Sequence, residues 1–146
     1  METNLILLIA LGIAFNVSIR LILRGSRHFI GVDAMPAFPI AAGYLYGFTG
    51  GLWAGIVISV SYYFMGGKNI SYAPLIVLIN ALVGAFSTLF AGWTFVTAGF
   101  LLLFVYHAIS LFVVSTLSEP GPGYFTFMVL NLVSSGLIIY FASQFI

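Results

Sequence analysis

Three polar side chains interrupt long apolar stretches in the second half of the sequence. They are Asn80, His107 and Asn131, and each lies inside a run long enough to form a membrane helix. Amide and imidazole groups carry hydrogen-bond donors and acceptors, so they suit either binding of a small molecule or bonding to a neighbouring helix. The chemistry that these residues favour is recognition through hydrogen bonds.

Residue types that support catalysis follow no known pattern in this sequence. The motifs HExxH, GxSxG and the P-loop are absent, and a pairing of Ser110 with His107 has no third group to orient the histidine. The positions of His28 and Asp33 relative to His107 match no metal-ligand spacing. The apolar runs contain no carboxylate, which argues against a proton or sodium pathway. We therefore expect no enzyme, no metal and no other cofactor.

The composition places these residues in a membrane. Apolar residues make up 62% of the 146 positions and charged residues 5%, whereas a typical soluble domain has about 25% charged residues. So few charges exclude a soluble enzyme, a disordered chain and a nucleic-acid binder. The chain has no cysteine, which excludes disulfides. We expect a multi-pass protein of the cell membrane, in contact with the lipid bilayer, in which residues 1–146 form a single transmembrane domain.

Continuous apolar runs favour membrane helices over the alternating pattern of barrel strands. The predicted class is an all-α integral membrane protein, a compact bundle of six transmembrane helices, with five as the alternative. The count depends on residues 35–65, which are too many for one upright helix and few for two. Here the sequence Thr49-Gly50-Gly51 predicts a break. The expected helices cover about residues 5–23, 37–48, 51–65, 73–91, 94–117 and 124–145.

The expected helix boundaries bring the three polar side chains to one depth. Asn80 and Asn131 lie near the starts of their helices, and His107 lies in the later part of its own. At 1.5 Å per residue, all three are roughly 10–15 Å from the same end of the bundle. They either line one pocket or each bond to a neighbouring helix, and the sequence leaves both alternatives open.

Other residues would complete such a pocket. The polar segment after the first helix contains Arg27 and Asp33, and we expect this segment to cover it. Tyr72, Tyr106 and Tyr124 lie near the same level, either as aromatic walls or as part of the belt at the membrane interface.

Small residues recur at every fourth position on several expected helices. They are Gly43, Gly47, Gly51 and Gly55; Ala10 and Ala14; and Ala81 and Ala85. This spacing lets helix backbones approach closely in lipid. It indicates packing within the chain, or docking of another membrane protein, for which Ala10 and Ala14 are the candidates.

Most charged residues are expected at one membrane face. With six helices, the loops after the first, third and fifth helices share a face and carry Arg24, Arg27, His28, Asp33, Lys68 and Glu119. Arg20 lies next to this face, and Glu2 is expected at the opposite one. The positive-inside rule favours a cytoplasmic location for the charged face.

A longer pattern connects these features. Ala10 to Ala14 on the first helix is followed by a polar loop and by the glycine-rich segment Pro39 to Gly55, PIAAGYLYGFTGGLWAG. Over most of the chain, this arrangement resembles the substrate-binding S components of energy-coupling factor (ECF) transporters. It is also similar to bacterial cell-shape membrane proteins of like architecture.

The resemblance to S components implies six helices, of which the second and third are short and glycine-rich. It also implies a pocket for a small molecule, either a vitamin-like compound or a metal ion, between the last three helices and the loop after the first. The residues expected to bind this substrate are Arg27, Asp33, Asn80, His107 and Asn131.

The partners implied are a transmembrane coupling subunit and ATPase subunits that drive uptake. Ala10 and Ala14 match the family's AxxxA element, which meets the coupling subunit. The family topology places the charged face outside, whereas the positive-inside rule favours the reverse. The alternative hypothesis is therefore a non-catalytic structural or accessory subunit, bound to other subunits of a larger membrane complex.

Overall fold

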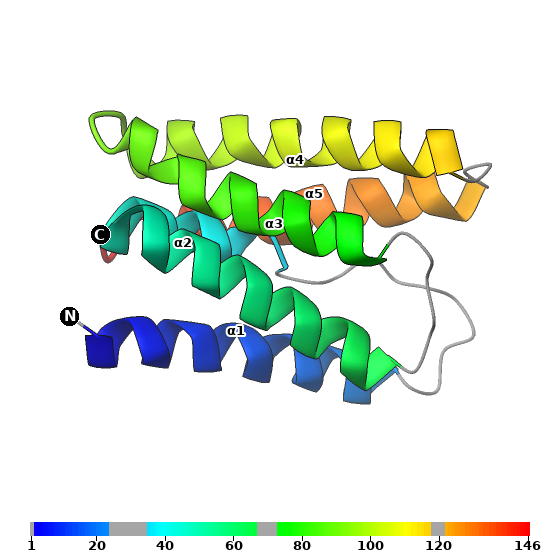
Figure 1. Cartoon of the computed structure of the whole chain (residues 1–146), viewed down its shortest axis with the longest axis horizontal. Helices are drawn as coiled ribbons and strands as arrows, with labels where there is room; N and C mark the ends of the chain where they lie inside the picture. Colours follow the sequence, from blue (N-terminus) through cyan, green and yellow to red (C-terminus); the bar gives the residue numbers. More distant parts are fainter. Residues whose placement is uncertain (1, 24–34, 67–72, 118–121) are drawn as a thin grey trace.

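The computed structural model describes residues 2–23, 35–66, 73–117 and 122–146. The elements are α1 (Glu2–Leu23), α2 (Ala37–Gly66), α3 (Ala73–Phe86), the 3-10 helix η1 (Ser87–Phe90), α4 (Phe95–Leu117) and α5 (Pro122–Ala142). All regular structure in these ranges is helical, which confirms the predicted all-α class (Figure 1).

Among the described residues, four helical stretches are long and apolar enough to cross a membrane. They are Ala37–Phe64, Ala73–Phe90, Phe95–Leu117 and Gly123–Ala142. A shorter apolar stretch, Thr3–Ile19, lies within α1. These lengths support a multi-pass membrane protein. They do not confirm the predicted count of six spans, because α1 holds only the shorter stretch and residues 37–64, which change direction at Gly47, count as a single one.

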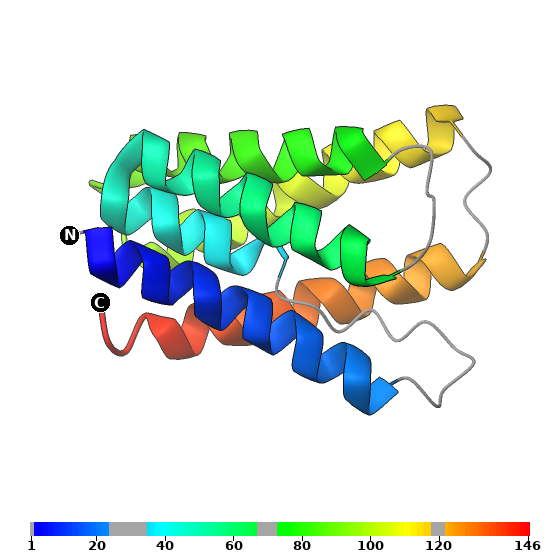
Figure 2. The same cartoon turned by 60° about the horizontal axis from the view of Figure 1, so that its bottom comes forward.

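That element, α2, turns back on itself at Gly47. The backbone angles of Gly47 are φ 79° and ψ −175°, a combination that essentially only glycine adopts. Figures 1 and 2 show the chain reversing its direction here, so that residues 37–46 (the first arm) and 48–66 (the second arm) run side by side. A Cβ atom on Gly12 of α1 would meet side chains of both arms, Phe38 and Ile58.

The predicted break at Thr49-Gly50-Gly51 was therefore wrong by a few residues. These three residues are helical, and the reversal lies at Gly47. A Cβ atom on Gly47 would meet nothing within 4 Å, whereas one on Gly51 would collide with the carbonyl of Gly84. Gly50 and Gly51 thus allow close packing, whereas Gly47 allows the turn.

Small residues bring α2 and α3 into backbone contact. Added Cβ atoms on Gly43 and Gly51 would meet the carbonyl oxygen of Gly84, and one on Gly55 would lie 2.5 Å from Cα of Ala81. Packing within the chain, one of the two predicted roles, is confirmed for Gly43, Gly51 and Gly55. It is wrong for Gly47, because the turn removes this residue from the helix face.

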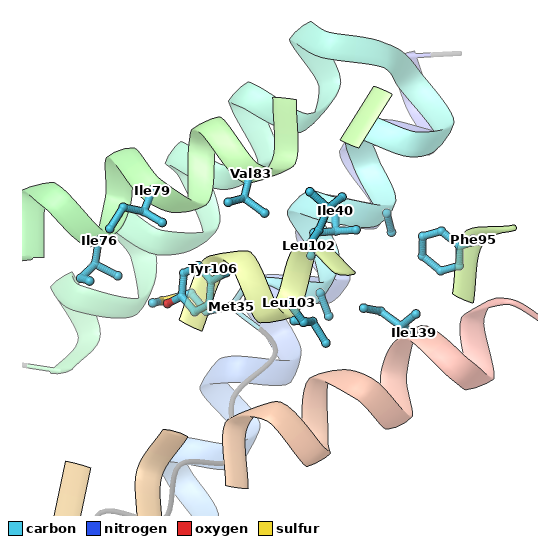
Figure 3. Packing of buried hydrophobic residues seen from close by; sticks show 12 residues of the cluster. Met35, Ile40, Ile76, Ile79, Val83, Phe95, Leu102, Leu103, Tyr106 and Ile139 are labelled. Atoms are coloured by element: carbon cyan, nitrogen blue, oxygen red, sulfur yellow. The ribbon is translucent and has the colours of Figure 1, made fainter. Parts of the chain in front are cut away.

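A buried apolar cluster joins the first arm of α2 to α3, α4 and α5. Figure 3 shows its members from the first arm, α3, α4 and α5, among them Ile40, Ile79, Leu103 and Ile139. Met35, which precedes α2, belongs to the same cluster and is 3% exposed. The first arm therefore begins inside the bundle and not at its surface.

Hydrogen bonds secure one end of the bundle, which we call the turn end because it holds Gly47. The Tyr44 hydroxyl donates to the carbonyl of Trp93 at 2.7 Å, and the Ser87 hydroxyl lies 2.9 Å from the carbonyl of Ile40. Both bonds connect the first arm to the region between α3 and α4. The opposite end, the loop end, holds the last turns of α1, α2 and α4 and the first turns of α3 and α5 (Figure 1).

Candidate functional site

Three of the five predicted substrate residues lie in the described helices. Arg27 and Asp33 are outside the described residues, as is Tyr72. The other three are buried: Asn80 on α3, His107 on α4 and Asn131 on α5 are 0%, 6% and 1% exposed.

The structure brings His107 and Asn131 together. Their side chains share a hydrogen bond across the interface between α4 and α5. Gly99 permits this approach, because an added Cβ atom there would lie 2.6 Å from a methyl group of Ile139. The ring of Tyr106 packs edge-on against the imidazole, with ring centroids 5.1 Å apart.

Asn80 pairs with a different helix. Its side-chain nitrogen donates to the hydroxyl of Ser59 on the second arm of α2, at 3.0 Å. Gly55 explains why the helices are close enough, since a Cβ atom there would lie 2.7 Å from the carbonyl oxygen of Asn80. The polar residues thus form one pair at the α2–α3 interface and another at the α4–α5 interface. Of the two roles that the sequence left open for Asn80, bonding to a neighbouring helix is the one observed.

Ser59 and Ser110 are two further buried polar residues. Ser59 did not stand out in the sequence, because serine is common in apolar helices. The sequence suggests Ser110 only as a nucleophile, although its spacing of three residues from His107 places both on one helix face. It is 4% exposed. That spacing within an apolar run was the available signal.

Several buried polar atoms have no hydrogen-bond partner among the described residues. They are Nε2 of His107, Oγ of Ser110 and Oδ1 of Asn80. A buried polar group that is not hydrogen-bonded costs free energy, so such atoms require an explanation. In a complex, Oδ1 of Asn80 can accept a hydrogen bond, Oγ of Ser110 can donate or accept one, and Nε2 of His107 can do one or the other. Within the described ranges, the His, Asp and Glu side chains form no group of three that could hold a metal ion.

Helix α1 has an inner face, which packs against α2, and an exposed outer face. Gly12 and Asn16 are buried on the face that meets α2, whereas Ala10 and Ala14 are exposed. Among the described helices, α1 packs against α2 alone. The predicted docking residues therefore lie on an uncovered face.

We found no matching family model, curated protein or solved structure for this chain. Its function must therefore be argued from the buried polar pairs and from the outer face of α1.

Proposed function

We propose that this chain is the substrate-binding membrane subunit of an ECF-type transporter. It captures a small molecule inside the helix bundle, and partner subunits that hydrolyse ATP complete the uptake. The observation that carries the proposal is the buried His107, which bonds to Asn131 on one side and leaves Nε2 without a partner among the described residues. Polar groups deep in membrane helices are costly, and they typically mark a substrate pathway or binding site.

The shape of α2 supports this proposal. If its two arms count as separate membrane segments, the bundle has the six segments that S components have. The first arm, residues 37–46, is short and contains Gly43, so it would correspond to the short glycine-rich second helix that the resemblance implies. Because this arm begins inside the bundle, the other helices build the loop end, and we expect binding to take place there.

The outer face of α1 supports the partner proposed for it. Ala10 and Ala14 are small and exposed, so a helix of the coupling subunit can approach the α1 backbone closely. The inner face of α1 is already occupied by α2. Docking on the outer face would thus leave the fold undisturbed.

Native mass spectrometry of the full chain in detergent tests the binding role. We expect the purified protein to carry a small molecule from the expressing cells, and His107→Ala and Asn131→Ala to lose it while keeping their helical circular dichroism. Ser115→Ala is the control, because Ser115 is exposed on the same helix and bonds to the carbonyl of Phe112. If the wild-type protein carries no small molecule, the proposal fails.

The second candidate is a structural or accessory subunit of a membrane complex. The uncovered face of α1 favours it as much as it favours a transporter, because both need a partner helix. It predicts that the protein dissociates from its complex when Ala10 or Ala14 is replaced by a larger residue. It also predicts that the wild-type protein carries no small molecule in the mass spectrum.

A further inference from the structure

We propose that the captured molecule is uncharged and that Ser110 binds it together with His107. This inference rests on the proposed function and specifies the chemistry of the same site. It depends on two observations: a second buried side chain with an unpartnered atom beside His107, and the character of every buried polar residue in the described helices.

Ser110 and His107 form a two-point hydrogen-bonding site on α4. They are three residues apart, so their Cβ atoms are about 5–6 Å from each other on one helix face. Their side chains are 4% and 6% exposed, and both Oγ of Ser110 and Nε2 of His107 have no partner among the described residues. A serine hydroxyl both donates and accepts, and an imidazole nitrogen does one or the other. The complementary ligand therefore presents a polar edge with more than one hydrogen-bonding atom.

The surroundings of this site favour a neutral ligand. The buried polar side chains that the structure describes are all amides, hydroxyls or imidazole: Asn16, Ser59, Asn80, Ser87, His107, Ser110, Asn131 and Ser135. An ion placed among these side chains would lose its water without gaining a counter-charge from them, and this is costly in an apolar interior. Tyr106 lies against the imidazole and belongs to the apolar cluster, so it offers a ring face or edge to the non-polar part of the ligand. A heterocycle with an amide-like edge combines these properties.

Ser110→Ala tests the assignment with little disturbance of packing. The full-length protein is purified with the small molecules that it carries from the cells, and the bound compound is identified by its exact mass. Equilibrium dialysis of that compound then compares wild type, Ser110→Ala and the control Ser115→Ala. We expect a compound that is neutral at pH 7, about fivefold weaker binding to Ser110→Ala, as for one lost hydrogen bond, and no change for the control.

The outcomes separate this inference from the function on which it rests. A bound anion, cation or metal ion, or equal affinity of Ser110→Ala and wild type, overturns the inference and leaves the binding role intact. A wild-type protein without any bound compound overturns both. If Ser110→Ala does not fold, Ser110→Cys serves in its place, because it keeps the approximate volume but forms only weak hydrogen bonds. It should weaken binding to a similar degree.

Discussion

Asn80 and Ser59 illustrate what a single polar pair contributes in an apolar bundle. Both are fully buried, and the amide donates to the hydroxyl at 3.0 Å across the α2–α3 interface. Asn80→Ala removes this bond, and we expect it to lower the free energy of unfolding by about 1 kcal/mol. Unfolding in mixed detergent with increasing dodecyl sulfate, followed by circular dichroism, measures the change.

A double-mutant cycle serves as the control for this loss. Ser59→Ala and Asn80→Ala together should show a coupling of about 0.6 kcal/mol, the average for hydrogen bonds between membrane helices. Asn80→Ala and Asn131→Ala should be additive within about 0.5 kcal/mol, because they belong to different pairs. Strong coupling between Asn80 and Asn131 would contradict this separation and restore the single pocket expected from the sequence.

Gly84 shows the cost of one methyl group where two backbones meet. An added Cβ atom would lie 2.6 Å from the carbonyl oxygen of Gly51 and 2.8 Å from Cβ of Pro39. Since neither group is the end of a flexible side chain, Gly84→Ala should destabilise the protein by about 2 kcal/mol. Gly92→Ala is the matched control, because a Cβ atom there meets nothing within 4 Å. Equal stability of the two variants would show that α2 and α3 are not in backbone contact.

The reversal of chain direction within α2 depends on a single residue, Gly47. Gly47 has a positive φ but open space around its Cα atom, so Gly47→Ala is opposed by backbone strain alone. We expect a destabilisation of about 1–3 kcal/mol. Gly123→Ala, also without a neighbour within 4 Å but without positive φ, should change stability little. Similar unfolding curves for the two variants would contradict a turn at Gly47.

Element boundaries were predictable where apolar runs end abruptly. The stretches predicted at about 73–91 and 94–117 match α3 with η1 and α4, because Gly92-Trp93 separates them and the sequences GGKN at 66–69 and EPGPG at 119–123 flank them. The position of the turn in α2 was not predictable. Five glycines are candidates for it, and only tertiary packing distinguishes them: Gly43, Gly47, Gly50, Gly51 and Gly55.

Depth in the membrane, which follows from counting residues, placed His107 opposite Asn131 correctly. It could not assign Asn80 to Ser59, because the direction of a side chain around its helix axis depends on which helix packs there.

The orientation of the whole molecule decides between the two candidate functions. The chain has no cysteine, so single cysteines report unambiguously. If the protein is a binding subunit with the family topology, the Ser26→Cys variant should react with an impermeant maleimide on intact cells. Thr94→Cys, exposed at the turn end, should react only after the membrane is opened. The reverse pattern would favour the accessory-subunit hypothesis.

The two faces of α1 should respond oppositely to enlargement. Gly12→Leu introduces bulk against Phe38 and Ile58, so we expect a loss of about 1–3 kcal/mol in stability. Ala14→Leu lies on the exposed face and should leave the unfolding curve unchanged. In blue native electrophoresis of mildly solubilised membranes, Ala14→Leu should nevertheless shift the protein from a complex toward its free mass. An unchanged complex would exclude this face as the docking site.

The short first arm also bears on how the protein is made. Residues 37–46 are about 15 Å long as a helix, half of the roughly 30 Å hydrocarbon core. Such a segment is too short to remain inserted in the bilayer as an independent span while the ribosome synthesises the rest of the chain. We therefore expect the two arms to leave the translocon together, as a hairpin closed at Gly47, only after the second arm has been synthesised. We therefore also expect a pause in membrane integration during biosynthesis, which the number of apolar runs in the sequence does not indicate.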